Sequence, residues 1–538
     1  MKSFLLSACL ILLTLIAAGH GTQGLSDPPE WKGAPDSEKV ELGSVESMCP
    51  ETVNESWRNE QRVAGVYIQD SRRCKPDNPF VVASVTRGTN NVDDEVLGRT
   101  GLSRDAVMKG EDLDRDGDPD VINITLEVAG LNGWRSATGR SAGWEIAPGI
   151  NPGFWVFAPK TRGMATEGSR ASGLIRMPSP SIRVEEGDEI NLELENTHYF
   201  PHTVHLHGVD HPFMSEGSGN DGVPQTSGEM VQPGESHTYD FRPRKAGTFF
   251  YHCHVQPSTH VLMGLNGIFV VSEDVENNTV QTFNIGNGKV RNPSKAVADK
   301  YSQEYDLLYQ GVDRELHSII RKSNDPRIIA EKINREYDVT ERDPDYFLLN
   351  GLSFPYTLRE SQVVVEKNQS TKLRILNSGS ETISIHTHGH RPVKTHVDGV
   401  KLDDPVRRDV FSISAAQRID LRLNTSDDGL NSYGPGIWFF HNHREESVTT
   451  NGIAPGGDIT LITYEEMLKK NGMPRHPNNW RKYFSEKYYK GEVPVWYGEK
   501  MPEFLKEAGS KPYQGTALIP ILFTGALLGI LAGWGWSK

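Results

Sequence analysis

The sequence predicts an all-β protein that contains two β-sandwich domains of one kind. The 538 residues include 52 Gly and 32 Pro, a composition typical of a turn-rich globular protein. Polar and apolar residues alternate over 182–196, as in a half-buried pair of strands, and the same pattern returns over 363–377. Each copy runs into a histidine cluster, and later into an aromatic strand that ends in a second histidine cluster. An internal repeat of this length indicates two related sandwich domains.

The charge balance makes nucleic acid a poor partner. The chain carries 57 basic and 71 acidic residues, which give a formal net charge of −14. Such a surface repels polyanions and attracts cations. Solubility is the simplest reading of this charge.

Residues 1–24 have the order of a secretory signal peptide. Met1 and Lys2 precede an apolar run over 4–18, and small residues follow it. A charged start, an apolar centre and a small-residue end are typical of an export signal. We therefore expect an exported protein.

Residues 25–115 read as an irregular extension, because they are polar and show no clear period. The chain has 4 cysteines, and Cys9 falls in the signal peptide. An odd number of cysteines in an exported chain leaves one thiol to be explained. We expect Cys49 and Cys74 to form a disulfide and Cys253 to stay free.

The extension ends in alternating carboxylates around a glycine turn, which resemble the start of a calcium-binding loop. Position twelve of such a loop falls on Asn123, where an EF-hand would place Glu. A weak structural calcium site and a plain acidic turn are both open. The carboxylates belong to Asp112, Asp114, Asp116, Asp118 and Asp120.

The two sandwich domains are expected over 116–275 and 300–466, with a linker over 276–299 between them. Apolar spacing predicts two short helices, over 314–321 and 328–333, inserted near the start of the second domain.

The C-terminal part reads as a charged stalk over 467–514 followed by an uncharged segment over 515–536. That segment is long enough to cross the hydrocarbon layer of a membrane as a helix. We expect it to anchor the exported protein to the cell membrane, with the catalytic domains on the outer face. A buried helix or a processed sorting tail is the alternative.

The chemistry of the chain is expected at four His-x-His pairs. Residues at i and i+2 of a strand share a face, so both imidazoles of a pair point the same way and favour a transition metal. Cys253 sharpens this prediction, because a thiolate with two histidines, His202 and His260, and a weak axial group is a blue-copper arrangement. The pairs are His205 and His207, His252 and His254, His386 and His388, and His441 and His443.

These motifs resemble those of the multicopper oxidases, in particular their two-domain, laccase-like branch, over about 116–466. The resemblance implies cupredoxin-like Greek-key β-sandwiches, about four coppers per subunit and a homotrimer whose neighbouring subunits complete each copper cluster. It also implies that O2 is reduced to water by electrons taken singly from a phenol, an amine or a low-valent metal ion. It assigns the type 1 copper to His202, Cys253 and His260, the type 2 copper to His205 and His386, and the type 3 coppers to His207, His252, His254, His388, His441 and His443.

The second domain departs from the first where a blue copper would lie. Ile383 stands at the counterpart of His202, and Asn442 stands at the counterpart of Cys253. The second domain should therefore hold no type 1 copper.

Two further roles stay open within the resemblance. The axial position of the type 1 copper falls on Leu265, five residues after His260, while Met263 is three residues after it. Asp221 matches a family position suited to proton relay near the cluster, although Asp-Gly is also a common turn.

Two other functions fit part of this ligand pattern. A copper nitrite reductase needs one mononuclear copper held by three histidines, and a copper electron-transfer protein needs only the type 1 ligands. Neither needs His254, His441 or His443, so both are less favoured than an oxidase.

Overall fold

The computed structural model describes residues 58–491 except 74–75, 133–134, 137–138, 141–142, 163–172, 297–300 and 476–479. The expected signal peptide, the two cysteines of the expected disulfide and the expected anchor over 515–536 lie outside the described residues. Within the residues that are described, no helix is long and apolar enough to span a membrane.

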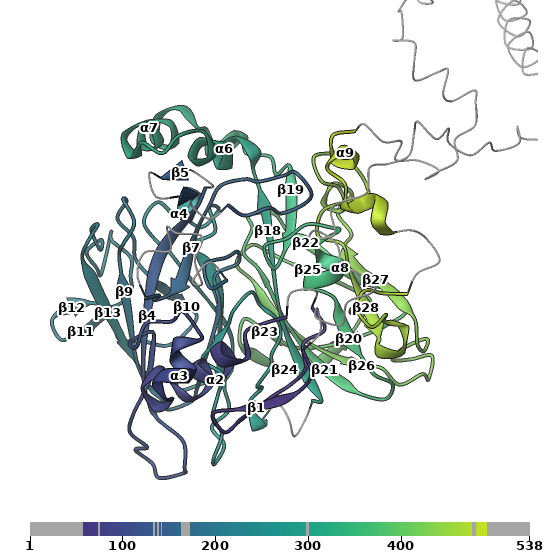
Figure 1. Ribbon diagram of the computed structural model, residues 1–538, viewed down its shortest axis with the longest axis horizontal. Coiled ribbons are helices and arrows are strands. Elements are labelled where there is room, and N and C mark those ends of the chain that lie inside the picture. The colour runs from purple at the N-terminus through teal and green to yellow at the C-terminus, as the bar shows by residue number, and fades with distance from the viewer. Residues whose placement is uncertain are drawn as a thin grey trace, which may run out of the picture. The chain divides into compact units, whose positions relative to one another are not determined.

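The first domain contains two β-sheets whose apolar side chains share one core (Figure 1). One sheet has the order β10 (His205–His207), β14 (Gly247–His252), β15 (Asn266–Ser272), β8 (Ser181–Glu185) and β16 (Phe283–Asn284). The other has the order β13 (Ser236–Phe241), β9 (Glu189–Glu195), β4 (Val121–Leu131) and β3 (Val107–Lys109), and β7 (Phe154–Pro159) also pairs with β4.

The second domain repeats this topology. One sheet has the order β20 (Val363–Val365), β28 (Thr460–Tyr464), β27 (Ile437–Asn442), β22 (Ile383–Thr387) and β25 (Val410–Ile413). The other has the order β17 (Gly288–Lys289), β18 (Gln303–Val312), β21 (Ser370–Asn377), β26 (Arg418–Asn424), β23 (Val393–Val397) and β24 (Val400–Arg407), with β19 (Tyr346–Leu349) also on β18. The order β8–β15–β14–β10 thus corresponds to β20–β28–β27–β22, and each series begins with a parallel pair. The prediction of a mostly β chain is confirmed.

The remaining named elements outside the extension and the insert described next are short. They are β5 (Arg135–Ser136), β6 (Gly139–Arg140), β11 (Met214–Ser215), β12 (Ser218–Gly219), α4 (Pro257–His260), α8 (Thr357–Glu360), α9 (Glu486–Tyr489) and the 3-10 helices η5 (Val339–Glu341), η6 (Glu445–Val448), η7 (Glu465–Met467) and η8 (Trp480–Phe484).

The described part of the extension is ordered, which differs from the irregular segment expected over 25–115. It forms β1 (Gln61–Val63), β2 (Val66–Ile68), α2 (Pro79–Arg87), η3 (Thr89–Asn91) and α3 (Asp94–Gly98). Helix α2 begins where the side chain of Asn78 accepts a hydrogen bond from the backbone N–H of Phe80. Val81 and Val85 join the apolar core of the first domain. An isolated helix this short is marginal, and packing against that core stabilises it.

The two helices expected over 314–321 and 328–333 are confirmed. They are α6 (Arg314–Lys322) and α7 (Pro326–Glu331), and a π-helical turn, η4 (Lys332–Glu336), follows them. We call residues 313–336 the helical insert. Leu316, Ile320 and Ile333 pack into the core of the first domain, and Figure 1 shows α6 and α7 beside α4. The insert therefore follows the linker in sequence but covers the first domain.

His317 attaches the helical insert to the first domain. Its ring Nδ1 donates a hydrogen bond to the backbone oxygen of Gly153 at 2.7 Å, its ring lies edge-on to Phe154, and its Nε2 is buried with no hydrogen-bond partner. Burial lowers the pKa of His317 to about 4. The neutral ring is therefore the form that the folded state favours.

We expect the contribution of His317 to stability to fall as the pH drops from about 6.5 towards 4. The folded pKa lies below the unfolded value of about 6.5, so the unfolded chain binds the proton more readily in this window. The contribution is complete above pH 6.5 and is lost below it. Urea unfolding of the copper-loaded protein at pH 7.5 and 4.5 should show a smaller acid destabilisation in His317→Gln than in the unmodified chain. An equal loss in both would contradict this role.

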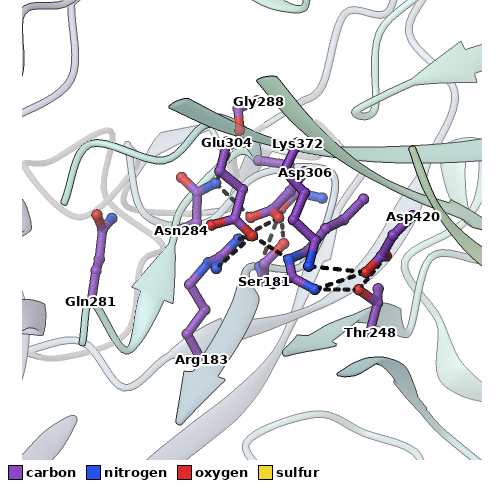
Figure 2. A network of polar contacts seen from close by, with 12 residues as sticks. Ser181, Arg183, Thr248, Gln281, Asn284, Gly288, Glu304, Asp306, Lys372 and Asp420 are labelled. Atoms are coloured by element: carbon purple, nitrogen blue, oxygen red, sulfur yellow. Dashed lines mark hydrogen bonds and ion pairs between the residues drawn. The ribbon is translucent and has the colours of Figure 1, made fainter. Parts of the chain in front are cut away.

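The two domains meet at a buried network of ion pairs (Figure 2). Arg183 of β8 lies 2.5 Å from Asp306 and 3.3 Å from Glu304, both on β18. Arg374 of β21 pairs with Glu304 and lies 3.2 Å from Asp420 of β26. Each of these five side chains is 3% exposed or less. The network fixes one domain against the other without contact with water.

Candidate metal centres

Three buried side chains form a compact site in the first domain. The Sγ atom of Cys253, which follows β14, lies 3.7 Å from Nδ1 of His202 and 3.5 Å from Nδ1 of His260. The three residues are 0%, 0% and 3% exposed, respectively. The thiol and two imidazole nitrogens therefore face one another in a dry pocket, and this donor set fits copper. Burial raises the pKa of the Cys253 thiol to about 11, so binding of a metal would release a proton there.

A fourth histidine, His198, orients this site and was not predicted from the sequence. Its Nδ1 lies 2.8 Å from Nε2 of His202, which leaves Nδ1 of His202 for the metal. The ring of His198 lies 3.9 Å from the ring of Tyr199 in a tilted arrangement and lies edge-on to Trp155. The sequence offers only one sign of this role, namely that His198 lies four residues before His202. No strand pattern links the two residues, so the spacing does not predict their contact.

Both candidates for the axial position are fully buried. Met263 and Leu265 are each 0% exposed and belong to the same apolar cluster as Cys253. The choice between them stays a prediction.

The first domain gathers four of the predicted cluster histidines. His205 of β10 pairs directly with His252 of β14, and possible ligand atoms of His205, His207 and His252 all lie within 4.8 Å of one another. The ring of His254 lies 5.4 Å from that of His205. The pairing of β10 with β14 therefore brings the two sequence motifs together, and we call these four histidines the first half-site.

The second domain builds the same half-site. His386 of β22 pairs directly with His441 of β27, in the register that joins His205 to His252. Nε2 of His388 lies 3.2 Å from Nε2 of His441, and the ring of His443 lies 5.4 Å from that of His441.

Backbone carbonyls fix the tautomer of two histidines in each half-site. Nδ1 of His205 lies 2.8 Å from the carbonyl oxygen of Asp221, and Nδ1 of His386 lies 2.9 Å from that of Asp409. His252 and His441 make the same kind of bond to the residue that follows each of them. A carbonyl can only accept, so Nδ1 carries the proton and the lone pair of Nε2 is free for a metal.

The two half-sites share no ring contact in the part of the chain that the structure describes. Among the described residues, each ring contact among these histidines links members of one domain only. The second half-site is open to solvent, since the side chain of His443 is 54% exposed. A second set of ligands could therefore approach it from outside the chain.

The second domain has no thiol where the first has Cys253. Asn442 occupies that place and accepts a hydrogen bond from the backbone N–H of Ser384 at 2.9 Å. Its amide nitrogen lies 3.4 Å from Asp458, whose carboxyl pKa is raised to about 7 by burial. Ile383 is buried in the domain core. Neither Asn442 nor Ile383 supplies a soft ligand for a type 1 copper.

Asp221 lies at the first half-site. Its Oδ1 is 3.1 Å from Nδ1 of His205 and 2.9 Å from Nε2 of His211. The Asp221–Gly222 turn requires glycine at its second position. Gly222 has φ +70°, and a Cβ there would lie 2.0 Å from the backbone oxygen of Val204. Asp221 therefore both begins a turn that requires glycine and contacts His205, a predicted copper ligand.

The acidic loop is only partly gathered. Ligand oxygens of Asp112, Asp114 and Asp120 lie within 4.8 Å of one another, and Asp116 groups with Asp114 and Asp274. Asp118 instead accepts a hydrogen bond from the backbone of Asn278 in the interior. The loop carboxylates also accept backbone hydrogen bonds within the turn. Calcium binding stays a prediction.

A pocket of about 230 Å³ lies against His260. Trp155, Phe200 and Val255 line it from the first domain, and Ala330 and Ile333 line it from the helical insert. Among the described residues that line this pocket, none is an acidic or a basic side chain other than the histidine itself.

Comparisons with known proteins identify similar sequences and structures. Two family models described as multicopper oxidase match residues 175–276 and 329–454. The multicopper oxidase MCE of Talaromyces pinophilus is 36% identical over 92 residues, which cover 17% of this chain and 14% of that protein. The iron transport multicopper oxidase FET3 of Gibberella zeae is 24% identical over 316 residues, which cover 54% of this chain and 44% of that protein. The chain thus spans less than half the length of these curated relatives.

Solved structures are similar as well. The blue copper oxidase from Nitrosomonas europaea has a TM-score of 0.49 at 24% identity, over 71% of this chain and 99% of that one. The multicopper oxidase mgLAC has a TM-score of 0.48 at 24% identity, over 69% of this chain and 95% of that one.

Proposed function

We propose that the chain, which two multicopper oxidase family models match over 175–276 and 329–454, is a member of that family that oxidises a small organic reductant by single electrons and reduces O2 to water. One observation carries this proposal: a Cys-His-His site stands beside a four-histidine half-site that has a counterpart in the other domain. Bound copper would supply one-electron oxidation at the first site and oxygen reduction at the completed cluster. Cys253 is bonded through the main chain to His252 and His254, so one tripeptide reaches both centres.

The proposed oligomeric state rests on the two separate half-sites. A half-site of four histidines in each domain, with no ring contact between the halves in the described chain, supports a homotrimer in which neighbouring subunits complete each cluster. Export by residues 1–24 and membrane attachment by residues 515–536 are part of the same proposal and rest on the sequence.

The pocket at His260 favours an uncharged aromatic reductant, a phenol or an amine. Aromatic and aliphatic side chains line it, as in sites for small organic molecules. A low-valent metal ion would need carboxylates, and the described lining has none. The name of one relative refers to iron transport, so the choice of reductant needs a direct test.

The test measures O2 uptake by the copper-loaded protein with 2,6-dimethoxyphenol and with Fe(II). We expect turnover of the phenol, and we expect Ala330→Trp, which fills the pocket, to raise the KM for the phenol about tenfold or more. Ile328→Trp is the matched control, because Ile328 lies on the same helix but is 44% exposed and outside the pocket. Preferred turnover of Fe(II), unaffected by Ala330→Trp, would contradict this assignment.

Asp221 is proposed to deliver protons to the cluster. Asp221→Asn removes the carboxylate but keeps the backbone carbonyl that holds His205, so copper content and blue absorption should not change. We expect kcat for O2 reduction to fall by about tenfold to a hundredfold, as for loss of a general acid. Unchanged turnover would show that Asp221 only shapes the turn.

A copper nitrite reductase is the second candidate, and the geometry argues against it. One mononuclear site would use three histidines, whereas His254, His441 and His443 extend both half-sites beyond that number. Rapid reduction of nitrite without O2 consumption would favour the reductase.

A further inference from the structure

A second cavity, of about 300 Å³, lies where the extension meets the first domain and the linker. It shares no lining residue with the pocket at His260. Its apolar wall contains Val81 and Val85 of α2 and Phe283 of β16. Four cationic side chains line the rest, namely Arg73, Arg176, Lys289 and Arg291.

These four cations outnumber the carboxylates that line the cavity. Among the described residues that line the cavity, Asp77 is the one carboxylate, and Arg58 already binds it at 2.6 Å and 3.0 Å. Arg291 reaches Asp77 only at 3.5 Å, and Lys289 reaches the nearby Asp70 only at 3.9 Å. A further buried carboxylate, Glu360, lies outside the lining and interacts electrostatically with Arg73 and Arg176. The described lining itself carries four cations and one carboxylate.

Two donors of this cluster have no acceptor. Arg291 is 5% exposed, and its Nη1 is buried without a hydrogen-bond partner among the described residues. The Nε atom of Arg176 is likewise buried without a hydrogen-bond partner among the described residues. Buried guanidinium N–H groups are normally satisfied, so an anionic acceptor is the missing component. Burial also lowers the pKa of Arg176 to about 10 and that of Lys289 to about 8.

We propose that this cavity binds a small organic anion whose carboxylate or phosphate group accepts hydrogen bonds from Arg176 and Arg291. A planar guanidinium presents paired donors that match either anion. The apolar part of the ligand packs against Val81, Val85 and Phe283, and the volume suits a ligand with a single ring. The site is independent of the copper centres and of the reductant.

The test uses isothermal titration calorimetry of the copper-loaded full chain with phenyl phosphate, benzoate and inorganic phosphate. Phenyl phosphate or benzoate should bind, and Arg291→Gln should weaken binding about tenfold or more. Arg176→Gln gives a second variant, because the Nε atom of Arg176 has no hydrogen-bond partner among the described residues. Arg422→Gln, on the exposed face of β26, is the matched control and should bind normally.

Failure has distinct forms. Absence of binding by all three probes, or binding that neither Arg291→Gln nor Arg176→Gln weakens, would overturn the site. Equal binding of inorganic phosphate and phenyl phosphate would overturn the role of the apolar wall and identify a site for free phosphate. None of these outcomes affects the oxidase proposal, because O2 uptake is measured separately.

Discussion

Mixing two inactive variants is expected to restore about one quarter of the unmodified activity, because each cluster would take its halves from neighbouring subunits of a trimer. One variant, His205→Ala/His207→Ala, lacks the first half-site, and the other, His386→Ala/His441→Ala, lacks the second. In a random equal mixture, about one interface in four joins two intact halves. The measurement is O2 uptake after the copper-free variants are dissociated, mixed, reassembled and loaded with copper.

The control mixes the first variant with His252→Ala, which damages the same half-site. No interface in that mixture has an intact first half, so no activity should return. If the two complementary variants also stayed inactive at all ratios while forming mixed oligomers, the cluster would have to form within one subunit. The separate ring contacts of the two half-sites would then need another explanation.

Replacing Arg374 by Met should lower the free energy of unfolding by about 3–5 kcal/mol, because Glu304 keeps only Arg183 and Asp420 keeps only Lys372 as a close cationic partner in a buried site. Arg374 contacts Glu304 and Asp420, and its Nη1 donates to Thr248 at 2.6 Å. Thr248 in turn donates to Asp420 at 2.6 Å (Figure 2). Since Thr248 lies on β14, which ends at His252, the change should also loosen the first half-site.

Urea unfolding at pH 7 measures this loss, and Lys367→Met is the control. Lys367 and its partner Glu466 are 53% and 51% exposed, and such surface pairs contribute about 0–1 kcal/mol. A loss below about 1 kcal/mol for Arg374→Met would contradict the role of the network. The neighbouring cations lower the pKa of Glu304 and of Asp420 to about 2 despite burial. Their contribution is therefore present above the unfolded pKa of about 4 and is lost as the pH falls towards 2.

Local patterns were sufficient to predict a mostly β chain and to place the two histidines of a His-x-His pair on one face of a strand. His205 and His207 are two residues apart on one strand, and this spacing alone places both on one face. The same holds for His386 and His388. The repeated topology then gives both domains the same strand register, which places His205 opposite His252 and His386 opposite His441.

Contacts between distant segments were not predictable in this way. Alternation over 182–196 indicates a half-exposed strand, yet all five residues of β8 are buried, because the second domain covers Arg183 with Glu304 and Asp306. His198 was missed for the same reason, since its role depends on the ring of His202 rather than on any spacing. The two helices were predicted over 314–321 and 328–333, but the position of the second beside the pocket at His260 appears only in the fold.

Copper content per subunit, measured with the visible and EPR spectra of the purified protein, tests the central claim most directly. The ligand sets predict about four coppers per subunit, a strong blue band from the Cys253 thiolate and one type 2 signal. About two coppers, with no sign of a coupled pair, would mean that the half-sites of the two domains do not assemble. The chain would then be a reductase-like or electron-transfer protein rather than an oxidase.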